Sequence, residues 1–256
     1  MKPYNTAKSK KDEVREMFDN IAPTYDRLNH ILSFSIDKIW RRRVVRKVRK
    51  MKPQRIMDLA TGTGDLAILM AKRIPQAKIM GVDLSEKMLA VAAEKIRRQG
   101  LDDHIALYQG DAENLELESG MMDVVTISFG IRNFSDMDKS LREIWRVVAP
   151  GGHLVVVELT MPSNPLVRKA YEFYSNHIMT PVGGMLSHDR KAFDYLPNSI
   201  AAFPKTKEFL KMMESAGFEQ CRNYFKELIN CLRQMNYSEF KSERFHEYQE
   251  KLNNLL

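Results

Sequence analysis

The chain has 256 residues, of which 44% are hydrophobic and 29% are charged, which is enough apolar material for one globular α/β domain. No apolar run approaches the roughly 20 residues that cross a bilayer, and the first residues lack the apolar segment of a secretory signal. The only two cysteines, Cys221 and Cys231, form no disulfide framework. These features exclude a disulfide-rich secreted protein and favour a cytoplasmic one.

The excess of positive charge, +7 overall, is concentrated near the N-terminus, in residues 1–53, which are predicted to form a helical extension. Within it, Trp40, Val44 and Val48 follow helical spacing, and arginine and lysine fill most of the positions between them. This pattern is typical of an amphipathic helix that packs on a domain and exposes a basic face. The alternative is a helix that lies on anionic lipid or on nucleic acid.

From residue 54 onward, short apolar runs alternate with longer stretches of helical periodicity. Strands that alternate with crossover helices are typical of a parallel sheet. The sequence therefore predicts an α/β fold with a doubly wound, mostly parallel Rossmann-like sheet and helices on both faces. The predicted strands cover 55–60, 78–82, 105–109, 124–129 and 154–158, and the predicted helices cover 65–73, 85–99 and 136–148.

Two parts of the predicted domain 54–256 lie outside this alternation. Residues 160–205 carry many aromatic side chains and few strand signals, so they are predicted to form a helical lid. Such a lid would cover the carboxyl ends of the strands, where open α/β sheets bind their ligands. Residues 225–256 are predicted to be helical and are highly polar.

The segment 58–64, DLATGTG, links the first predicted strand to the first helix of the domain. Gly62 and Gly64 allow a sharp turn and a close approach of a ligand to the backbone, and the helix that follows offers unpaired N–H groups. Asp83 ends the second strand, where its carboxylate can accept both hydroxyls of a ribose. Taken alone, these residues also fit the dinucleotide-binding pattern.

Three features favour S-adenosylmethionine over a dinucleotide. Asp58 lies inside the loop motif, where its carboxylate suits the ammonium of a methionine group and would repel a pyrophosphate. Asp111 follows the third strand and is placed to accept from an adenine amino group. A Pro-Gly-Gly turn at 150–152 and a fifth strand follow, without a second mononucleotide half.

Several stretches of the sequence resemble a known family. Those at 58–64, 81–83, 110–112 and 146–152 resemble class I S-adenosylmethionine-dependent methyltransferases. Three more resemble the menaquinone/ubiquinone biosynthesis C-methyltransferases within that class: FDNIAPTYDRLN at 18–29, TISFGIRN at 126–133 and DYLPNSI at 194–200. The resemblance covers residues 14–224. Asp37 departs from the pattern, which more often has histidine there, and we expect no consequence. The family usually ends in a β-hairpin, and the polar segment 225–256 departs from this too.

The resemblance implies roles for individual residues in cofactor binding. Thr63 would lie in the loop that contacts S-adenosyl-L-methionine, and Asp83 would bind its ribose. Asp111 and the backbone of Ala112 would bind adenine, and Ser128 would border the methionine part. The implied acceptor is a ring carbon of a demethylated isoprenoid quinol, in the first place demethylmenaquinol. The alternatives are 2-methoxy-6-polyprenyl-benzoquinol of ubiquinone biosynthesis, or a cofactor-binding scaffold without turnover.

A hydroquinone ring carbon becomes nucleophilic when a neighbouring phenol, with a pKa of ~10, loses its proton. Arg132 is the candidate catalytic cation, because a fixed positive charge favours the ionised oxygen. Asn133 would orient that oxygen or a water molecule, and Tyr25 would line the pocket. A guanidinium is a poor base, so water or a carboxylate would have to take the proton.

Each of these assignments has a structural alternative. Arg132 could form an ion pair with Asp136 or Asp138 of the following helix. His177 and His188 are candidate bases in the lid, although a lone histidine is more often structural. No spacing typical of metal ligands occurs, so no metal is expected.

The expected partners follow from the implied acceptor. They are a prenylated quinol, an anionic membrane surface contacted peripherally from the cytoplasmic side, and a second copy of the chain in a homodimer. An RNA methyltransferase is the alternative that the basic helix suggests. No Asn-Pro-Pro-Tyr-type motif and no added nucleic-acid module occur, so a nucleic acid is not expected.

Overall fold

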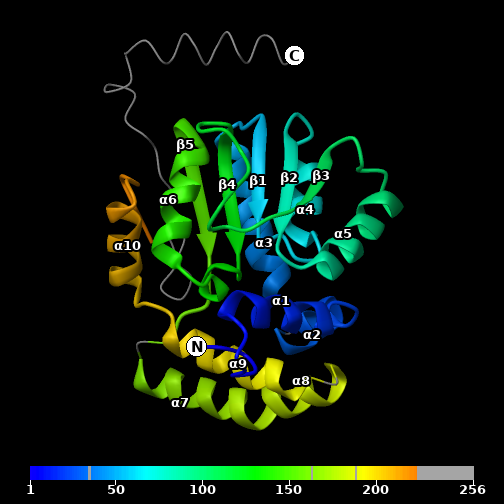
Figure 1. Ribbon diagram of the computed structural model, residues 1–256, viewed down its shortest axis with the longest axis vertical. Helices are drawn as coiled ribbons and strands as arrows, with labels where there is room; N and C mark the ends of the chain where they lie inside the picture. Colours follow the sequence, from blue (N-terminus) through cyan, green and yellow to red (C-terminus); the bar gives the residue numbers. More distant parts are fainter. Residues whose placement is uncertain (34–35, 163, 188, 224–256) are drawn as a thin grey trace.

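The computed structural model describes residues 1–33, 36–162, 164–187 and 189–223. Its centre is a parallel sheet with the strand order β3-β2-β1-β4-β5 (Figure 1). This confirms the predicted doubly wound α/β fold. The strands are β1 (Arg55–Leu59), β2 (Lys78–Asp83), β3 (Ile105–Gln109), β4 (Met122–Ser128) and β5 (Val148–Val157). The predicted tail at 225–256 lies outside the described residues.

Both faces of the sheet are apolar, as β1 illustrates. Successive residues of a strand point to opposite faces, and Ile56 and Met57 are both fully buried. Ile56 belongs to a cluster with α3 (Ile36–Lys50), α4 (Asp65–Arg73) and α5 (Glu86–Arg98). Met57 belongs to a second cluster, with α6 (Met137–Val147) and α10 (Thr206–Ser215). Helices therefore cover both faces of the sheet.

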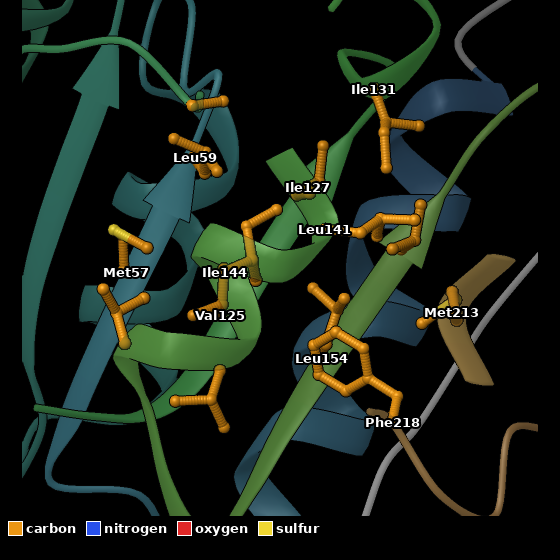
Figure 2. Close-up of a cluster of buried hydrophobic side chains, with 14 of the residues drawn as sticks. Met57, Leu59, Val125, Ile127, Ile131, Leu141, Ile144, Leu154, Met213 and Phe218 are labelled. Atoms are coloured by element: carbon orange, nitrogen blue, oxygen red, sulfur yellow. The ribbon is translucent and has the colours of Figure 1, made fainter. Parts of the chain in front are cut away.

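The second cluster fixes α6 and α10 on the half of the sheet that contains β4 and β5. Figure 2 shows Leu141 and Ile144 of α6 beside Val125 and Ile127 of β4, with Met213 of α10 at one edge. All five side chains are fully buried. Burying an aliphatic side chain contributes about 1.5–3 kcal/mol, so such a cluster holds the carboxyl ends of these strands rigidly in register.

Two layers of helices cover the carboxyl ends of the strands (Figure 1). The nearer layer contains α1 (Lys10–Ile21) and α2 (Tyr25–Leu32). The outer layer is the predicted lid. It consists of α7 (Pro165–Tyr174), the π-helix η2 (Ser175–Met179), α8 (Thr180–Ser187) and α9 (Arg190–Ala202). A third cluster joins the two layers, because Met17 and Leu28 pack with Phe193 and Tyr195.

The basic helix α3 packs on the sheet as an amphipathic helix. Val44, Val45 and Val48 are buried against α4 and the sheet, whereas Arg42, Arg46 and most of its other cations are exposed. The apolar stripe expected from the sequence therefore faces the core. No helix within the described ranges is long and apolar enough to cross a membrane.

Candidate functional site

A cleft of about 760 Å³, partly open to solvent, lies at the carboxyl ends of β1, β2 and β4. The strand order reverses between β1 and β4, which is where doubly wound sheets bind ligands. Loops of the sheet form the floor of the cleft, and α1 and α2 form its roof through Lys11, Val14, Arg15, Phe18 and Tyr25.

The floor of the cleft holds an unusual number of left-handed backbone conformations. Gly62 has φ 57° and Gly64, which precedes α4, has φ 77°. Ala60 and Phe129 also have positive φ, 56° and 61°, although side chains disfavour this region. Gly130 permits this arrangement, because a Cβ there would lie 2.5 Å from the Cβ of Ala60. Such strain is held in place by the surrounding fold and concentrates at functional sites.

Asp83, at the end of β2, binds the glycine loop and also lines the cleft. Its carboxylate accepts hydrogen bonds from the backbone N–H of Gly62 at 2.7 Å and of Ser85 at 2.9 Å. Burial raises the pKa of Asp83, while these backbone donors lower it. Each oxygen keeps a further lone pair, so the carboxylate can accept from two neighbouring hydroxyls.

Asp111 and Ala112, which follow β3, also line the cleft. One oxygen of Asp111 accepts from the backbone N–H of Glu113 at 2.9 Å, and the other binds the ammonium group of Lys11. Lys11 also lies 3.4 Å from a carboxylate oxygen of Glu113. This lysine could not be predicted from the sequence, because it is far from Asp111 along the chain and reaches it only when α1 covers the strands.

Asp58 lies under the cleft and is not among the described residues that line it. Its carboxylate is 1% exposed and accepts from the hydroxyls of Thr61 at 2.7 Å and Thr126 at 2.6 Å. Burial raises the pKa of Asp58 to about 6, against the lowering effect of the two hydroxyls. In this structure the carboxylate therefore braces β1 against β4 and the glycine loop.

Thr63 also points away from the cleft, into a network of charged residues. Its hydroxyl donates to Asp26 of α2 at 2.5 Å, and Asp26 pairs with Lys95 of α5 at 2.7 Å. Lys95 and Arg41 both bind Asp65, at 2.5 Å and 3.1 Å. The network thus ties the glycine loop and α4 to the helices above them.

Asp37 ends this network, contrary to the expectation that its departure from the family pattern has no consequence. It is 4% exposed and binds Arg41 at 2.5 Å. It also accepts from Ser33 at 2.8 Å and contacts His30 at 3.0 Å. Burial raises the pKa of Asp37, but these partners lower it below its usual value.

Arg132 lies in the short helix η1 (Ile131–Asn133), next to the cleft but outside its lining. Its guanidinium binds Glu158 at 2.5 Å, and the two side chains are 8% and 0% exposed. It also donates to the backbone oxygen of Phe129 at 2.5 Å and to the hydroxyl of Ser199 in α9 at 3.3 Å. The alternative of a pair with Asp136 or Asp138 is wrong.

The reason lies in the local geometry. The side chain of Asp136 accepts from the backbone N–H of Lys139 and so caps the start of α6. The guanidinium instead turns toward the carboxyl end of β5, where Glu158 follows the strand. Glu158 is therefore a site residue that the sequence reading missed.

Tyrosines surround this buried cation. The charge of Arg132 acts on Tyr25, Tyr171 and Tyr195, which come from α2, α7 and α9. Burial raises the pKa of Tyr195 to about 12 and raises that of Tyr25 as well, so both stay protonated near neutral pH. Tyr25 lines the cleft, whereas Tyr195 is buried in the cluster between the helical layers.

Asn133 lines the cleft beside Arg132 and is 6% exposed. Its side-chain oxygen is buried and has no hydrogen-bond partner among the residues that the structure describes. A buried polar atom without a partner costs about 1–3 kcal/mol, so it is better suited to a ligand donor than to the protein alone.

Of the two lid histidines, His177 does not reach this site. His177 is exposed on η2, stacks on Phe173 and binds the backbone oxygen of that residue at 3.1 Å. His188 lies outside the described residues. Across the described ranges, no group of histidine, cysteine, aspartate or glutamate could hold a metal ion.

The lining of the cleft fits a nucleoside with an amino-acid tail. Asp83 and Asp111 offer carboxylate acceptors at two positions, Val14, Phe18 and Met88 offer apolar walls, and Ser128 and Asn133 add polar groups at the β4 end. Of the predicted cofactor residues, Gly62, Asp83, Asp111, Ala112 and Ser128 line the cleft, whereas Asp58, Thr63 and Gly64 support it from below.

Comparison with known proteins agrees with the resemblance noted from the sequence. The model of the ubiE/COQ5 methyltransferase family matches residues 6–230. A demethylmenaquinone methyltransferase of Bacteroides fragilis is 42% identical over 86% of this chain and 90% of its own length. A ubiquinone/menaquinone biosynthesis C-methyltransferase of Syntrophotalea carbinolica is 44% identical over 82% and 88% of the two chains.

Solved structures agree on the fold. An S-adenosylmethionine-dependent methyltransferase of Aquifex aeolicus has a TM-score of 0.53 and 17% identity over 75% of this chain and 89% of its own. The [4+2]-cyclase SpnF has a TM-score of 0.59 and 20% identity over 82% and 72% of the two chains. Since one fold serves both a methyltransferase and a cyclase, the reaction has to be argued from the site and from the close relatives.

Proposed function

Because the chain belongs to the ubiE/COQ5 methyltransferase family, we propose that it transfers a methyl group from S-adenosyl-L-methionine to a ring carbon of a demethylated isoprenoid quinol. The C-methyltransferase activity follows from the family. Demethylmenaquinol is the favoured acceptor, because relatives at 40% to 42% identity are named demethylmenaquinone methyltransferases. The family also contains proteins named for both ubiquinone and menaquinone synthesis, so the benzoquinol acceptor is the second candidate.

When bound, S-adenosyl-L-methionine supplies an activated methyl group, so the protein mainly has to position donor and acceptor. In our proposal Asp83 accepts the ribose hydroxyls, and Asp111 accepts the adenine amino group when its contact with Lys11 loosens. Ser128 borders the methionine part. Asp58, Thr63 and Gly64 act as positioning residues that hold the loop on which Gly62 lies.

On the acceptor side, Arg132 would stabilise the phenolate oxygen of the quinol. A fixed cation in a buried site lowers the pKa of a nearby phenol, which increases the electron density on the ring. Glu158, Phe129 and Ser199 hold the guanidinium in place. Asn133 would bind the acceptor through its unpartnered amide oxygen, and Tyr25 would close the pocket beside it. The buried Arg132 beside the cofactor cleft is the observation that carries this proposal.

The test is turnover of the Arg132→Ala variant with a quinol acceptor. We expect kcat to fall by about 10²–10³-fold while the Kd of S-adenosylmethionine, measured by calorimetry, stays near that of the wild type. Arg73→Ala, which removes an exposed cation, is the matched control and should leave both values unchanged. Unchanged turnover in Arg132→Ala would remove the residue from the mechanism.

A second measurement identifies the acceptor. Quinones extracted from cells that lack the protein should contain a species one methyl group lighter, and its ring system distinguishes naphthoquinol from benzoquinol. Cofactor binding without transfer to any quinol would instead support the scaffold alternative.

We also propose that the partners include an anionic membrane surface, since a prenylated acceptor resides in a bilayer, and a second copy of the chain as a homodimer. The expected place of action is the cytoplasmic side of that membrane.

A further inference from the structure

The exposed large apolar side chains of the described chain are unevenly distributed. Most of them gather on the outer helical layer and on the segment of α2 and α3 next to it. Figure 1 shows α7 and α8 as the layer farthest from the amino ends of the strands. Six lie on α7, η2 and α8 and three on α2 and α3: Leu166, Val167, Phe173, Ile178, Met185, Leu186, Ile31, Ile36 and Ile39.

The helix from Pro165 to Ser187 has one face that is covered by the protein and one that is exposed. Met179, Gly183 and Ser187 recur every four residues and are buried against the protein. On the other side, Leu166, Ala170, Phe173, His177, Pro181 and Met185 recur every three or four residues and are all exposed. Leu166 is 77% exposed, Met185 is 71% exposed and α7 buries no residue at all. A contiguous apolar stripe of this kind marks an interaction surface.

Five exposed cations lie on α7, at the start of α9 and in the first turn of α3, together with two exposed acids, Glu172 and Asp194. Arg168, Lys169, Arg190, Lys191 and Lys38 are exposed, and none of them forms an ion pair with any residue that the structure describes. Apolar side chains bordered by unpaired lysine and arginine are typical of helices that lie in the headgroup region of an anionic bilayer.

We propose that this outer face, from Leu166 to Met185 with Ile31, Ile36 and Ile39, docks the protein onto an anionic lipid bilayer. The inference rests on the proposed function, because it assigns the membrane that holds the prenylated acceptor to one surface of the molecule. The basic helix α3 contributes mainly its first turn, since the rest of the helix packs against α4 and β5 on one face of the sheet.

The inner side of the same helix leads to the acceptor site. Phe173 is 61% exposed, whereas Tyr171, two residues earlier, points toward the protein. Burial raises the pKa of Tyr171, and the positive charge of Arg132 lowers it. Tyr174 donates to the backbone oxygen of Leu32 at 2.5 Å, which fixes the helix on α2. Tyr171 therefore links the outer helix to the surroundings of Arg132.

A second copy of the chain is a poorer occupant of this face. In a two-fold dimer the same patch meets itself, so the unpaired cations of one copy would lie against those of the other. Anionic headgroups instead neutralise them, at about 1 kcal/mol for each lysine or arginine.

The test is co-sedimentation of the whole chain with vesicles of phosphatidylglycerol and phosphatidylcholine, and with vesicles of phosphatidylcholine alone. We expect the wild type to bind the anionic vesicles more strongly. The triple variant Leu166→Gln, Phe173→Gln and Met185→Gln should lower the partition coefficient at least tenfold. Tyr108→Gln is the matched control, because Tyr108 is an aromatic residue, 52% exposed, on the distant strand β3.

Two further measurements distinguish a loss of membrane binding from a loss of folding or catalysis. The Kd of S-adenosylmethionine should be the same in the wild type and the triple variant, which shows that the variant is folded. Turnover with a water-soluble quinol without a prenyl tail should also be unchanged, whereas turnover with a long-chain quinol in vesicles should fall with vesicle binding. Vesicle binding without turnover on any quinol would contradict the proposed function but would still support the docking surface.

The proposal is overturned if the triple variant binds anionic vesicles as well as the wild type does. It is also overturned if the wild type binds no vesicles and sediments as a dimer that the triple variant converts to a monomer, since the face would then be an interface between two copies.

Discussion

The two ends of the cleft are built in different ways. At the end formed by the loops after β1, β2 and β3, backbone N–H groups of the loops hold the carboxylates, as those of Gly62 and Ser85 hold Asp83. At the end formed by η1, the groups depend on distant segments, because Arg132 is held by Glu158 and Ser199. The first end therefore rests largely on loop backbone, and the second rests on side chains of separate segments that meet when the chain has folded.

Two buried acids illustrate the difference between the two ends of the cleft. Asp58 lies under the cofactor end, and within the described residues only the hydroxyls of Thr61 and Thr126 donate to it. Glu158 lies at the acceptor end and is paired with a guanidinium. An ionised carboxylate that is buried among hydroxyls remains costly, whereas a paired one depends entirely on its partner. Substitutions can distinguish the carboxylate among hydroxyls from the carboxylate paired with a cation.

The largest effect is expected when Glu158 is replaced by Leu. Removing one partner of a buried ion pair leaves an uncompensated charge and costs about 3–5 kcal/mol in the free energy of unfolding. Urea denaturation measures this loss. The double variant Arg132→Met with Glu158→Leu removes both charges and should recover most of the lost stability, while turnover stays low. A loss below about 1 kcal/mol in Glu158→Leu would mean that water reaches Arg132 and that the pair does not organise the acceptor end.

The same contrast explains what the sequence predicted. The parallel strands, α4 and the residues at the ends of β1, β2 and β3 followed from periodicity and from a glycine-rich turn, which are local signals. The start of β5 was placed too late, because the strand begins at Val148 and includes the turn at Gly151, where φ is 76°. A glycine pair after a proline looks like a stop signal, yet Gly152 lets the chain approach the backbone oxygen of Asp123 closely.

The acceptor end and the roof could not be predicted in the same way. Arg132 was predicted to be the catalytic cation, and the alternative ion-pair partner was sought in the next helix, because ion pairs are usually local on the surface. Lys11 and Glu158 carried no signal, since each reaches its partner only through the packing of separate elements. The role of Asp37 was missed for a related reason, because its partner Arg41 joins it to Asp65 only when α3 lies beside α4.

The next effect concerns Asp58 and depends on pH. Its pKa is raised from an ordinary value near 3.8 to about 6, so the folded state holds a proton that the unfolded state releases. The free energy of unfolding should therefore fall as the pH rises from about 4 to 6, by up to about 1.4 kcal/mol per pH unit, and then level off.

Asp58→Asn is the variant that isolates this contribution. It cannot ionise, so its stability relative to the wild type should increase across the same window, by about 2–3 kcal/mol in total. Urea denaturation at several pH values gives the difference, with Asp102→Asn, an exposed aspartate, as the control. A pH-independent difference between Asp58→Asn and the wild type would show that Asp58 keeps its ordinary pKa and that the two acids are not distinguished by their donors.

The smallest effect is expected for Asp83→Asn, and it tests the cofactor end by itself. The amide keeps one acceptor oxygen, but its NH₂ group would face the backbone N–H of Gly62 or Ser85, so the loop loses a charge-assisted hydrogen bond. At about 1.5–3 kcal/mol for a hydrogen bond to a charged group, the Kd of S-adenosylmethionine should rise between ten- and 150-fold. Turnover at saturating cofactor should change only a few-fold, because Arg132 and Glu158 at the other end are untouched. Calorimetric titration gives the Kd and steady-state assays give the turnover. If kcat falls as far as the affinity for S-adenosylmethionine does, the two ends of the cleft are coupled. The cofactor end and the acceptor end would then not act as separate parts of the site.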